Sequence, residues 1–103
     1  MLNKKSEIIM ELSKVGSTDF NVRKINGIYN LVFNRKFKDY KETLSFVNDI
    51  ANISEKLDHH PEIFFNYNTV KIKIYTHSHK TITNKDIEFA SLVSKKNKKI
   101  IKT

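Results

Sequence analysis

The chain has 103 residues, of which 39% are hydrophobic and 29% are charged, and these proportions are typical of one soluble globular domain. It has no cysteine, which excludes a disulfide framework and thiolate metal sites, and no apolar run approaches the roughly 18 residues that a membrane span needs. The first residues lack the apolar segment of a secretory signal. We therefore expect a single domain over residues 1–103 and a cytoplasmic location.

The net charge of +8 raises the question of nucleic-acid binding. Only Arg23 and Arg35 are arginines, and the lysines are spread along the whole chain, whereas recognition of bases and phosphates favours arginine. We interpret the lysines as a solvated surface and do not expect nucleic acid to be the main partner. The lysine-rich stretch 95–102 still leaves contact with RNA or DNA open as a secondary role.

The first third of the chain predicts a helix and a pair of strands. Residues 3–14 carry apolar side chains at helical spacing. A short extended piece at Phe20–Val22 is followed by Asn26-Gly27, which is a strong hairpin signal. Residues 28–37 then alternate between apolar and polar side chains, a pattern that is typical of a half-buried strand.

The middle of the chain predicts the longest helix. Asp39 and Glu42 have the spacing of a capping box, in which Asp39 accepts from the N3 amide and Glu42 reaches back. From Tyr40 to about Leu57 the apolar residues fall within about half of a helical wheel. Pro61 prevents the helix from continuing.

Two further strands are expected after this helix. A short strand at about 62–66 leads through a turn into residues 69–77, where apolar and polar side chains alternate cleanly. One face of this second strand is apolar. The other face carries Lys71, Lys73, Tyr75 and His77.

The last expected element is a third helix. Thr83 and Asp86 resemble an N-terminal cap, with Asp86 at the N3 position, where the helix dipole favours a negative charge. This helix should end near Lys95, and residues 95–103 should form a basic, frayed tail. The order helix, strand, strand, helix, strand, strand, helix predicts an α+β domain, with a four-stranded antiparallel sheet and the helices packed on one face.

The stretch Glu55–Tyr67 concentrates the polar chemistry of the chain at a junction between a helix and a strand. It contains the adjacent pair His59 and His60, followed by Pro61, the only proline. Proline disfavours the helical region for the residue before it. We therefore expect both histidine rings to lie where the backbone turns, free to face a cleft.

The histidine spacing does not suggest a functional metal site. Adjacent histidines are awkward first ligands, and no H-E-x-x-H pair is present. His77 and His79 would share one face of a strand, so an incidental metal site stays open. Covalent catalysis has no support, because the chain lacks cysteine and no serine lies in a nucleophile elbow. We expect neither a metal nor a cofactor.

Proton transfer fits these histidines better, because histidine changes charge near neutral pH. Glu55 and Asp58, one helical turn apart, are spaced to orient the rings. In the alternative interpretation both acids are solvated helix residues and His59 caps the helix C-terminus. His77 favours the catalytic interpretation, because its strand parity takes it off the apolar face.

The spacing of these residues resembles the signature of the pterin-4a-carbinolamine dehydratase family. The flanking sequences Phe37-Lys38-Asp39-Tyr40 and Thr76-His77 are similar to the F-x-D-F and T-H motifs of that family, and the resemblance covers roughly residues 28–93. The matching signature positions are Glu55, His59, His60, Pro61, Tyr67, His77 and Asp86.

This resemblance implies an α+β domain that forms dimers or tetramers. It implies dehydration of a 4a-hydroxytetrahydropterin to quinonoid dihydropterin, within tetrahydrobiopterin recycling and without metal or cofactor. By the same resemblance, His59 and His77 transfer protons, whereas His60 positions the pterin. The implied supporting residues are Glu55 and Asp58 beside the histidines, Pro61 and Tyr67 in the turn and the pocket wall, and Asp86 as a helix cap that shapes the pocket.

The chain departs from the family pattern at three points. Family members usually carry a tryptophan ahead of the first long strand, where Phe20 is the nearest candidate here. Arg35 replaces a frequent aromatic residue, and Thr81 replaces a usual glycine. Animal members also bind a homeodomain transcription factor, so a non-enzymatic dimerisation or transcriptional coactivator module is the rival function. The complete histidine set favours the enzyme.

Overall fold

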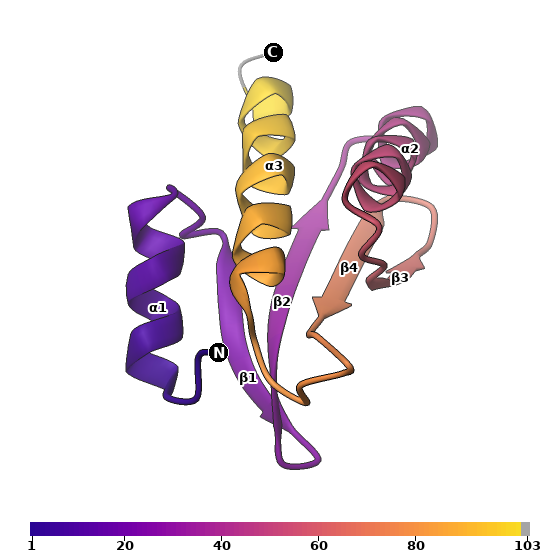
Figure 1. The fold of residues 1–103 in the computed structure, drawn as a ribbon. Coiled ribbons are helices and arrows are strands. Elements are labelled where there is room, and N and C mark those ends of the chain that lie inside the picture. Colours follow the sequence, from indigo (N-terminus) through magenta and orange to yellow (C-terminus); the bar gives the residue numbers. More distant parts are fainter. Residues whose placement is uncertain (102–103) are drawn as a thin grey trace.

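Three helices lie against one face of a four-stranded antiparallel sheet, whose strands follow the order β1-β2-β4-β3 (Figure 1). The structure is a computed structural model that describes the backbone of residues 1–101 and the side chains of residues 1–99. The predicted α+β fold and order of elements are confirmed. The elements are α1 (Lys5–Lys14), β1 (Phe20–Ile25), β2 (Ile28–Lys36), α2 (Tyr40–Leu57), β3 (Glu62–Phe65), β4 (Thr69–Ile74) and α3 (Asn84–Ile101). No helix within the described residues is long and apolar enough to cross a membrane.

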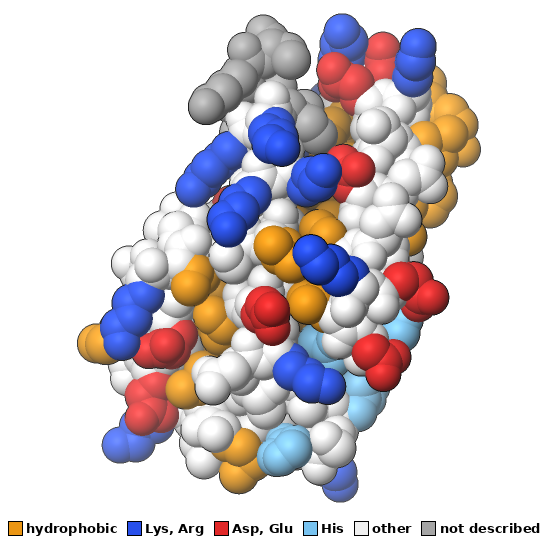
Figure 2. All heavy atoms as spheres, turned by 45° about the horizontal axis from the view of Figure 1, so that its top comes forward, with side chains coloured by type: hydrophobic (Ala, Val, Ile, Leu, Met, Phe, Trp, Pro, Cys, Tyr) orange, Lys and Arg blue, Asp and Glu red, His pale blue; other side chains and the backbone are white. Residues whose placement is uncertain are grey.

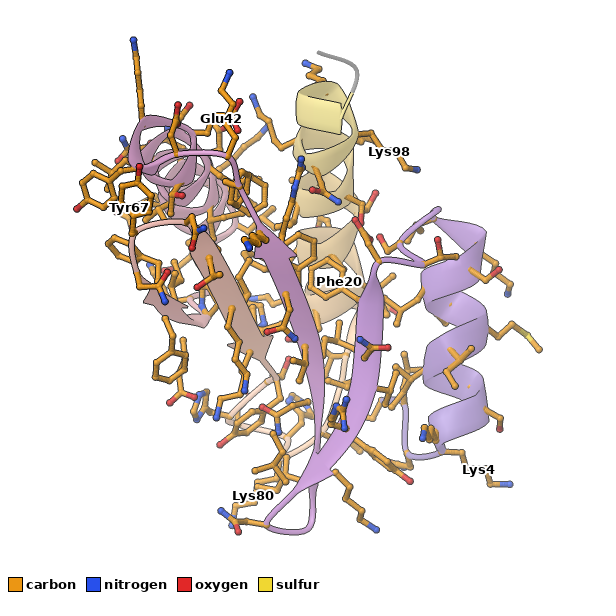
Figure 3. All side chains as sticks on the ribbon, turned by 180° about the vertical axis from the view of Figure 1, so that it is seen from behind. Lys4, Phe20, Glu42, Tyr67, Lys80 and Lys98 are labelled. Carbon is orange, nitrogen blue, oxygen red and sulfur yellow. The ribbon has the colours of Figure 1, made fainter. Side chains whose placement is uncertain are left out.

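The register of the strands sorts the side chains onto two faces of the sheet. Leu31 and Phe33 of β2 pair with Ile74 and Ile72 of β4, and all four are buried beneath the helices. Lys73, between the two isoleucines, belongs to the opposite face, because successive side chains of a strand alternate. The alternation predicted for this strand is confirmed, although regular pairing ends at Ile74. Figure 3 looks onto the face that the helices leave uncovered.

Aromatic rings join the sheet to the helices. Phe33 of β2, Phe46 of α2 and Phe89 of α3 are fully buried. The ring centroid of Phe33 lies 5.6 Å from that of Phe46 and 5.3 Å from that of Phe20 at the start of β1. Buried aromatic rings supply much of the apolar contact in a small core. These contacts fix α2 and α3 over the sheet, and the two helices carry residues of the candidate site.

The N-terminus of α2 has the predicted cap, with one difference. The Glu42 amide donates a hydrogen bond to Asp39 Oδ1 at 2.9 Å, as expected for an N-cap. The Glu42 side chain, however, accepts from the amide of Lys38 at 3.4 Å and not from that of Asp39. The helix spans Tyr40–Leu57, as the apolar pattern predicted.

The C-terminus of α2 is closed by a left-handed turn at Asp58, whose φ angle is 49°. The amide of His59 donates to the carbonyl of Ser54 at 3.1 Å, and the amide of Asp58 donates to the carbonyl of Glu55 at 3.3 Å. This pair of bonds is a Schellman motif, which satisfies the last helical carbonyls. The turn reverses the chain just before His60, so the helix end itself sets the direction of the histidine pair.

The end of α3 corrects the sequence prediction. The helix does not end near Lys95 but continues to Ile101. The prediction of a frayed tail is therefore wrong for residues 95–101, and residues 102–103 lie outside the described residues. Lysine is a good helix former, and tertiary contacts hold this part of the helix. Buried Asn97 accepts from Arg35 and donates to Asp19 Oδ2 at 2.9 Å. Lys98 Nζ donates to the Gly16 carbonyl at 3.2 Å.

We predict that Asn97→Ala lowers the free energy of unfolding by about 2 kcal/mol, because it removes buried hydrogen bonds to Arg35 and Asp19. Urea denaturation followed by circular dichroism measures the change. Asn48→Ala is the matched control, because Asn48 is exposed on α2, and it should cost about 0.5 kcal/mol or less. Equal effects of the two substitutions would show that the Asn97 contacts do not anchor α3.

Candidate active site

A cleft of about 250 Å³ opens at one end of the sheet, beside the turn that joins β1 to β2. Asn30, Glu62 and Lys73, from three different strands, contribute to its lining. Their positions alternate with core residues along the strands, so the cleft belongs to the face of the sheet that the helices do not cover. The complete lining is Ile25, Asn26, Ile28, Asn30, His60, Glu62, Lys73, Ile74, Tyr75 and His77.

His60 enters the cleft from the turn that follows α2. Its Nε2–H donates to Glu55 Oε2 at 2.6 Å, and the left-handed turn at Asp58 brings the two residues together. The side chains of His60 and Glu55 are 56% and 79% exposed, so this pair adds little stability. Its effect is to fix the orientation of the His60 ring.

His77 enters the cleft from the chain that continues beyond β4. The centroid of its ring lies 4.3 Å from that of Tyr75, at an interplanar angle of 33°. Both residues follow the parity of Lys73, which places them on the uncovered face. The ring of Tyr75 therefore packs against that of His77 and adds an aromatic surface to the cleft.

Behind the cleft, a buried carboxylate joins three segments of the chain. The Asp86 side chain is wholly buried in the first turn of α3. Its Oδ1 accepts from Nε2–H of His59 at 2.6 Å, and its Oδ2 accepts from the Thr76 hydroxyl at 2.6 Å and from the Thr83 amide at 2.9 Å. Asp86 thus occupies its predicted N3 position, and every neighbour in this network donates to it.

The hydroxyls around Asp86 form an ordered chain. The Lys85 amide donates to Thr83 Oγ1 at 3.3 Å, and the Thr83 hydroxyl lies 2.7 Å from that of Thr76. Because Thr76 donates to the carboxylate, the Thr83 hydroxyl donates to Thr76. A carboxylate oxygen only accepts, so the hydrogen of the His59–Asp86 bond is on Nε2 of the histidine ring.

Two residues that bind Asp86 each precede a cleft histidine in the sequence: His59 precedes His60, and Thr76 precedes His77. Successive side chains of an extended chain point to opposite sides. Asp86 therefore anchors, on the helix side, the residue that precedes each cleft histidine. His59 itself is 11% exposed and does not line the cleft.

Comparison with known proteins identifies the family of this chain. A sequence model of the family described as Pterin 4 alpha carbinolamine dehydratase matches residues 19–96. The chain belongs to the pterin-4a-carbinolamine dehydratase family. It is also similar to a protein of Trichormus variabilis to which that dehydratase activity has been assigned by inference, with 41% identity over 63 residues that cover 61% of this chain and 68% of the relative.

Two solved structures share the fold of this dehydratase family member. The transcriptional coactivator/pterin dehydratase from Brucella melitensis has a TM-score of 0.77 and 32% identity, and the match covers 91% of this chain and 96% of that one. A pterin dehydratase-like protein identified as a RuBisCO assembly factor in the alpha-carboxysome has a TM-score of 0.62 and 22% identity, with 73% and 84% covered. The second likeness concerns the fold alone.

The structure brings most of the predicted site residues of this dehydratase family member together. His60 and His77 line the cleft, Glu55 holds His60, and Asp86 holds His59 behind it. Half-buried Pro61 leads directly into β3.

Two predicted site residues, Asp58 and Tyr67, do not line the cleft. Tyr67, expected in the pocket wall, is in the turn at the far end of β3 and β4, where it is 63% exposed and stacks on Tyr40 at 6.2 Å between centroids. Figure 3 shows Tyr67 and Lys80 at opposite ends of the sheet. Asp58 forms the left-handed turn directly before His59, and its side chain makes no hydrogen bond within the described residues, so the support expected from its carboxylate stays a prediction.

Several cleft residues were not singled out from the sequence, namely Asn30, Glu62, Lys73 and Tyr75. The strand alternation that placed His77 off the apolar face also places Lys73 and Tyr75 on the same face as His77. The sequence pattern was therefore enough to predict two of these four cleft residues. Phe20, the nearest candidate for the missing tryptophan, is buried against Phe33 and does not line the cleft. Tyr75 provides the aromatic ring there instead.

The remaining histidine lies outside the cleft. His79 is exposed in the loop after His77, with its Nδ1 3.0 Å from the Ser78 hydroxyl. In the part of the chain that the structure describes, no three His, Asp or Glu side chains come together as metal ligands.

We predict that Asp86→Asn reverses the tautomer of His59. An amide in place of the carboxylate can donate to Nε2, which moves the ring proton to Nδ1. Long-range ¹⁵N–¹H correlation spectra of the histidine rings measure this directly, and the substitution should cost about 1–3 kcal/mol of stability. Asp49→Asn, on α2 and away from the histidines, is the control. An unchanged His59 spectrum would contradict the role given to Asp86.

Proposed function

We propose that this chain dehydrates a 4a-hydroxytetrahydropterin to quinonoid dihydropterin and water. The observation that carries the proposal is the presence of His60 and His77 in one cleft of a chain from the pterin-4a-carbinolamine dehydratase family. Elimination of water needs one group that gives a proton and one that accepts it, and two histidines in one cleft can supply both near neutral pH.

The reaction balances with histidine side chains alone. The C4a–O bond of the pterin breaks, and the hydroxyl leaves as water with a proton from one imidazolium. N5 of the pterin gives its proton to a second, neutral imidazole, and the N5=C4a double bond forms. At the end of the step the first ring has lost a proton and the second has gained one. Proton exchange with solvent returns both rings to their starting states.

The cleft lining suits a flat, polar ring system. Its volume of about 250 Å³ lies just below the range of about 300–1,000 Å³ that is usual for ligand sites, which favours a small ligand. Tyr75, Ile25 and Ile28 offer aromatic and apolar surface. The Glu62 carboxylate and the Asn30 side-chain oxygen can accept from the amino and N–H groups of a pterin.

Within this proposal, the cleft geometry favours His60 and His77 as the residues that meet the substrate. The family resemblance gave that role to His59 and His77. His59 does not line the cleft, and its Nε2 is occupied by Asp86. We therefore assign His60 to the proton-transfer pair and give His59 the task of holding the turn that presents His60.

Spectrophotometric measurement of carbinolamine dehydration tests the function directly. Native protein prepared with EDTA should accelerate the reaction well above its spontaneous rate. A rate equal to the spontaneous one would leave the rival function, a non-enzymatic dimerisation or coactivator module, as the better interpretation, because such a module needs no acid–base chemistry in the cleft.

We predict that His77→Ala and His60→Ala each lower kcat by about 100-fold or more, which is the usual contribution of a positioned acid or base. His79→Ala should leave the rate unchanged. Asp58→Gly is a second control within the same turn and should also retain the rate, because glycine favours its left-handed backbone. A large loss of kcat in His59→Ala, with only KM altered in His60→Ala, would return the proton-transfer role to His59.

We also propose that the chain forms dimers or tetramers, as the family resemblance implies. β3 is an edge strand of the sheet, and edge strands offer unpaired backbone groups to a neighbour. Phe64, Phe65 and Tyr67, on β3 and in the turn that follows it, are between 45% and 63% exposed. Light scattering of purified protein should give the mass of two or four chains, and the mass of one chain at micromolar concentration would contradict this.

A further inference from the structure

A second concave surface lies between α2 and α3. It is a groove of about 310 Å³, and each helix lines it with four residues at the spacing i, i+3, i+4 and i+7. Ile53 and Leu92 form an apolar floor, one from each helix. The groove lining consists of Asp49, Asn52, Ile53 and Lys56 from α2 with Leu92, Lys95, Lys96 and Lys99 from α3. We call it the lysine groove.

The charge around the lysine groove is unbalanced. Four lysines face a single acidic residue, Asp49. None of the four lies within 4.0 Å of a carboxylate among the described residues, whereas Lys14, Lys38 and Lys73 elsewhere each have an acidic partner. Figure 2 shows Lys and Arg side chains (blue) gathered around exposed hydrophobic ones (orange) on this face of the molecule.

Helix dipoles explain only part of this arrangement. Lys56 lies in the last turn of α2 and Lys99 in that of α3, where positive charge is favoured. Lys95 and Lys96 lie earlier in α3, where the dipole effect has fallen off. Lys98, on the same helix, binds the Gly16 carbonyl and is not part of the groove. Neither an ion pair nor the helix dipole therefore accounts for the charges of Lys95 and Lys96.

We propose that the lysine groove binds an acidic amphipathic segment of a partner protein. Apolar side chains of the segment would pack on Ile53 and Leu92, and its carboxylates would face Lys95, Lys96 and Lys99. The groove follows about two helical turns, so a short helix fits it. This surface lies on the helix side of the sheet, so the partner and a ligand in the cleft can bind at the same time.

The lining favours this occupant over other polyanions. Single-stranded nucleic acids bind through aromatic platforms, and base recognition uses arginine, but the groove contains neither an aromatic residue nor an arginine. Its apolar floor lies within a groove between two helices, whereas amphipathic surfaces that bind a bilayer present their apolar side chains outward. A protein segment can supply both the carboxylates and the protruding apolar groups.

Fluorescence anisotropy with a defined probe tests the proposal. The probe is a fluorescein-labelled peptide of about 15 residues, with Leu at i, i+3, i+4 and i+7 and Glu elsewhere. We expect saturable binding that weakens about tenfold or more when the Leu residues are replaced by Ser. Lys95→Glu/Lys96→Glu should weaken binding at least about tenfold. Lys36→Glu/Lys71→Glu makes the same change in net charge on the opposite face of the sheet and should alter affinity less than about twofold.

Other outcomes would overturn the proposal. Equal binding of the Ser peptide, or equal loss in both double variants, would show only diffuse attraction of a basic protein for a polyanion. Tighter binding of a 15-nucleotide oligo(dT), or of vesicles made from equal parts of phosphatidylcholine and phosphatidylserine, would assign the groove to nucleic acid or membrane instead. Circular dichroism of each variant establishes that it is folded, and Leu92→Gln provides an independent test of the apolar floor.

Discussion

The buried carboxylate of Asp86 is the interaction on which the candidate active site depends. A charge removed from water must be compensated, and this one is compensated by donors from two other segments, His59 and Thr76, and by Thr83 just before its own helix. Asp86 therefore ties the turn after α2 and the end of β4 to the start of α3. His60 and His77 directly follow two of those donors in the sequence, and both line the cleft.

Local patterns in the sequence were sufficient for most of the fold. The cap at Asp39 and the apolar stripe gave the bounds of α2, and strand alternation identified the uncovered face that carries His77. The N3 position of Asp86 followed from the cap spacing alone. These features could be predicted because hydrogen bonds and side-chain periodicity within a few residues determine them.

The features that the sequence missed depend on contacts between distant residues. The length of α3 depends on Asn97 meeting Arg35 and Asp19, which no local pattern reveals. Tyr67 shares the signature spacing, but the hairpin carries it to the end of the sheet away from the cleft. Asp58 is a local case, because its left-handed backbone places it in the turn that closes α2, and the supporting role expected of its carboxylate stays a prediction.

We infer that a pterin binds in the cleft that His60 and His77 line. The most direct measurement is a titration of the native protein with 7,8-dihydropterin, which lacks the 4a-hydroxyl, followed by ¹H–¹³C spectra of the four histidine rings. We expect the His60 and His77 signals to shift together and to saturate, while the His79 signal stays in place. Unchanged His60 and His77 signals at a pterin concentration that saturates binding would contradict it.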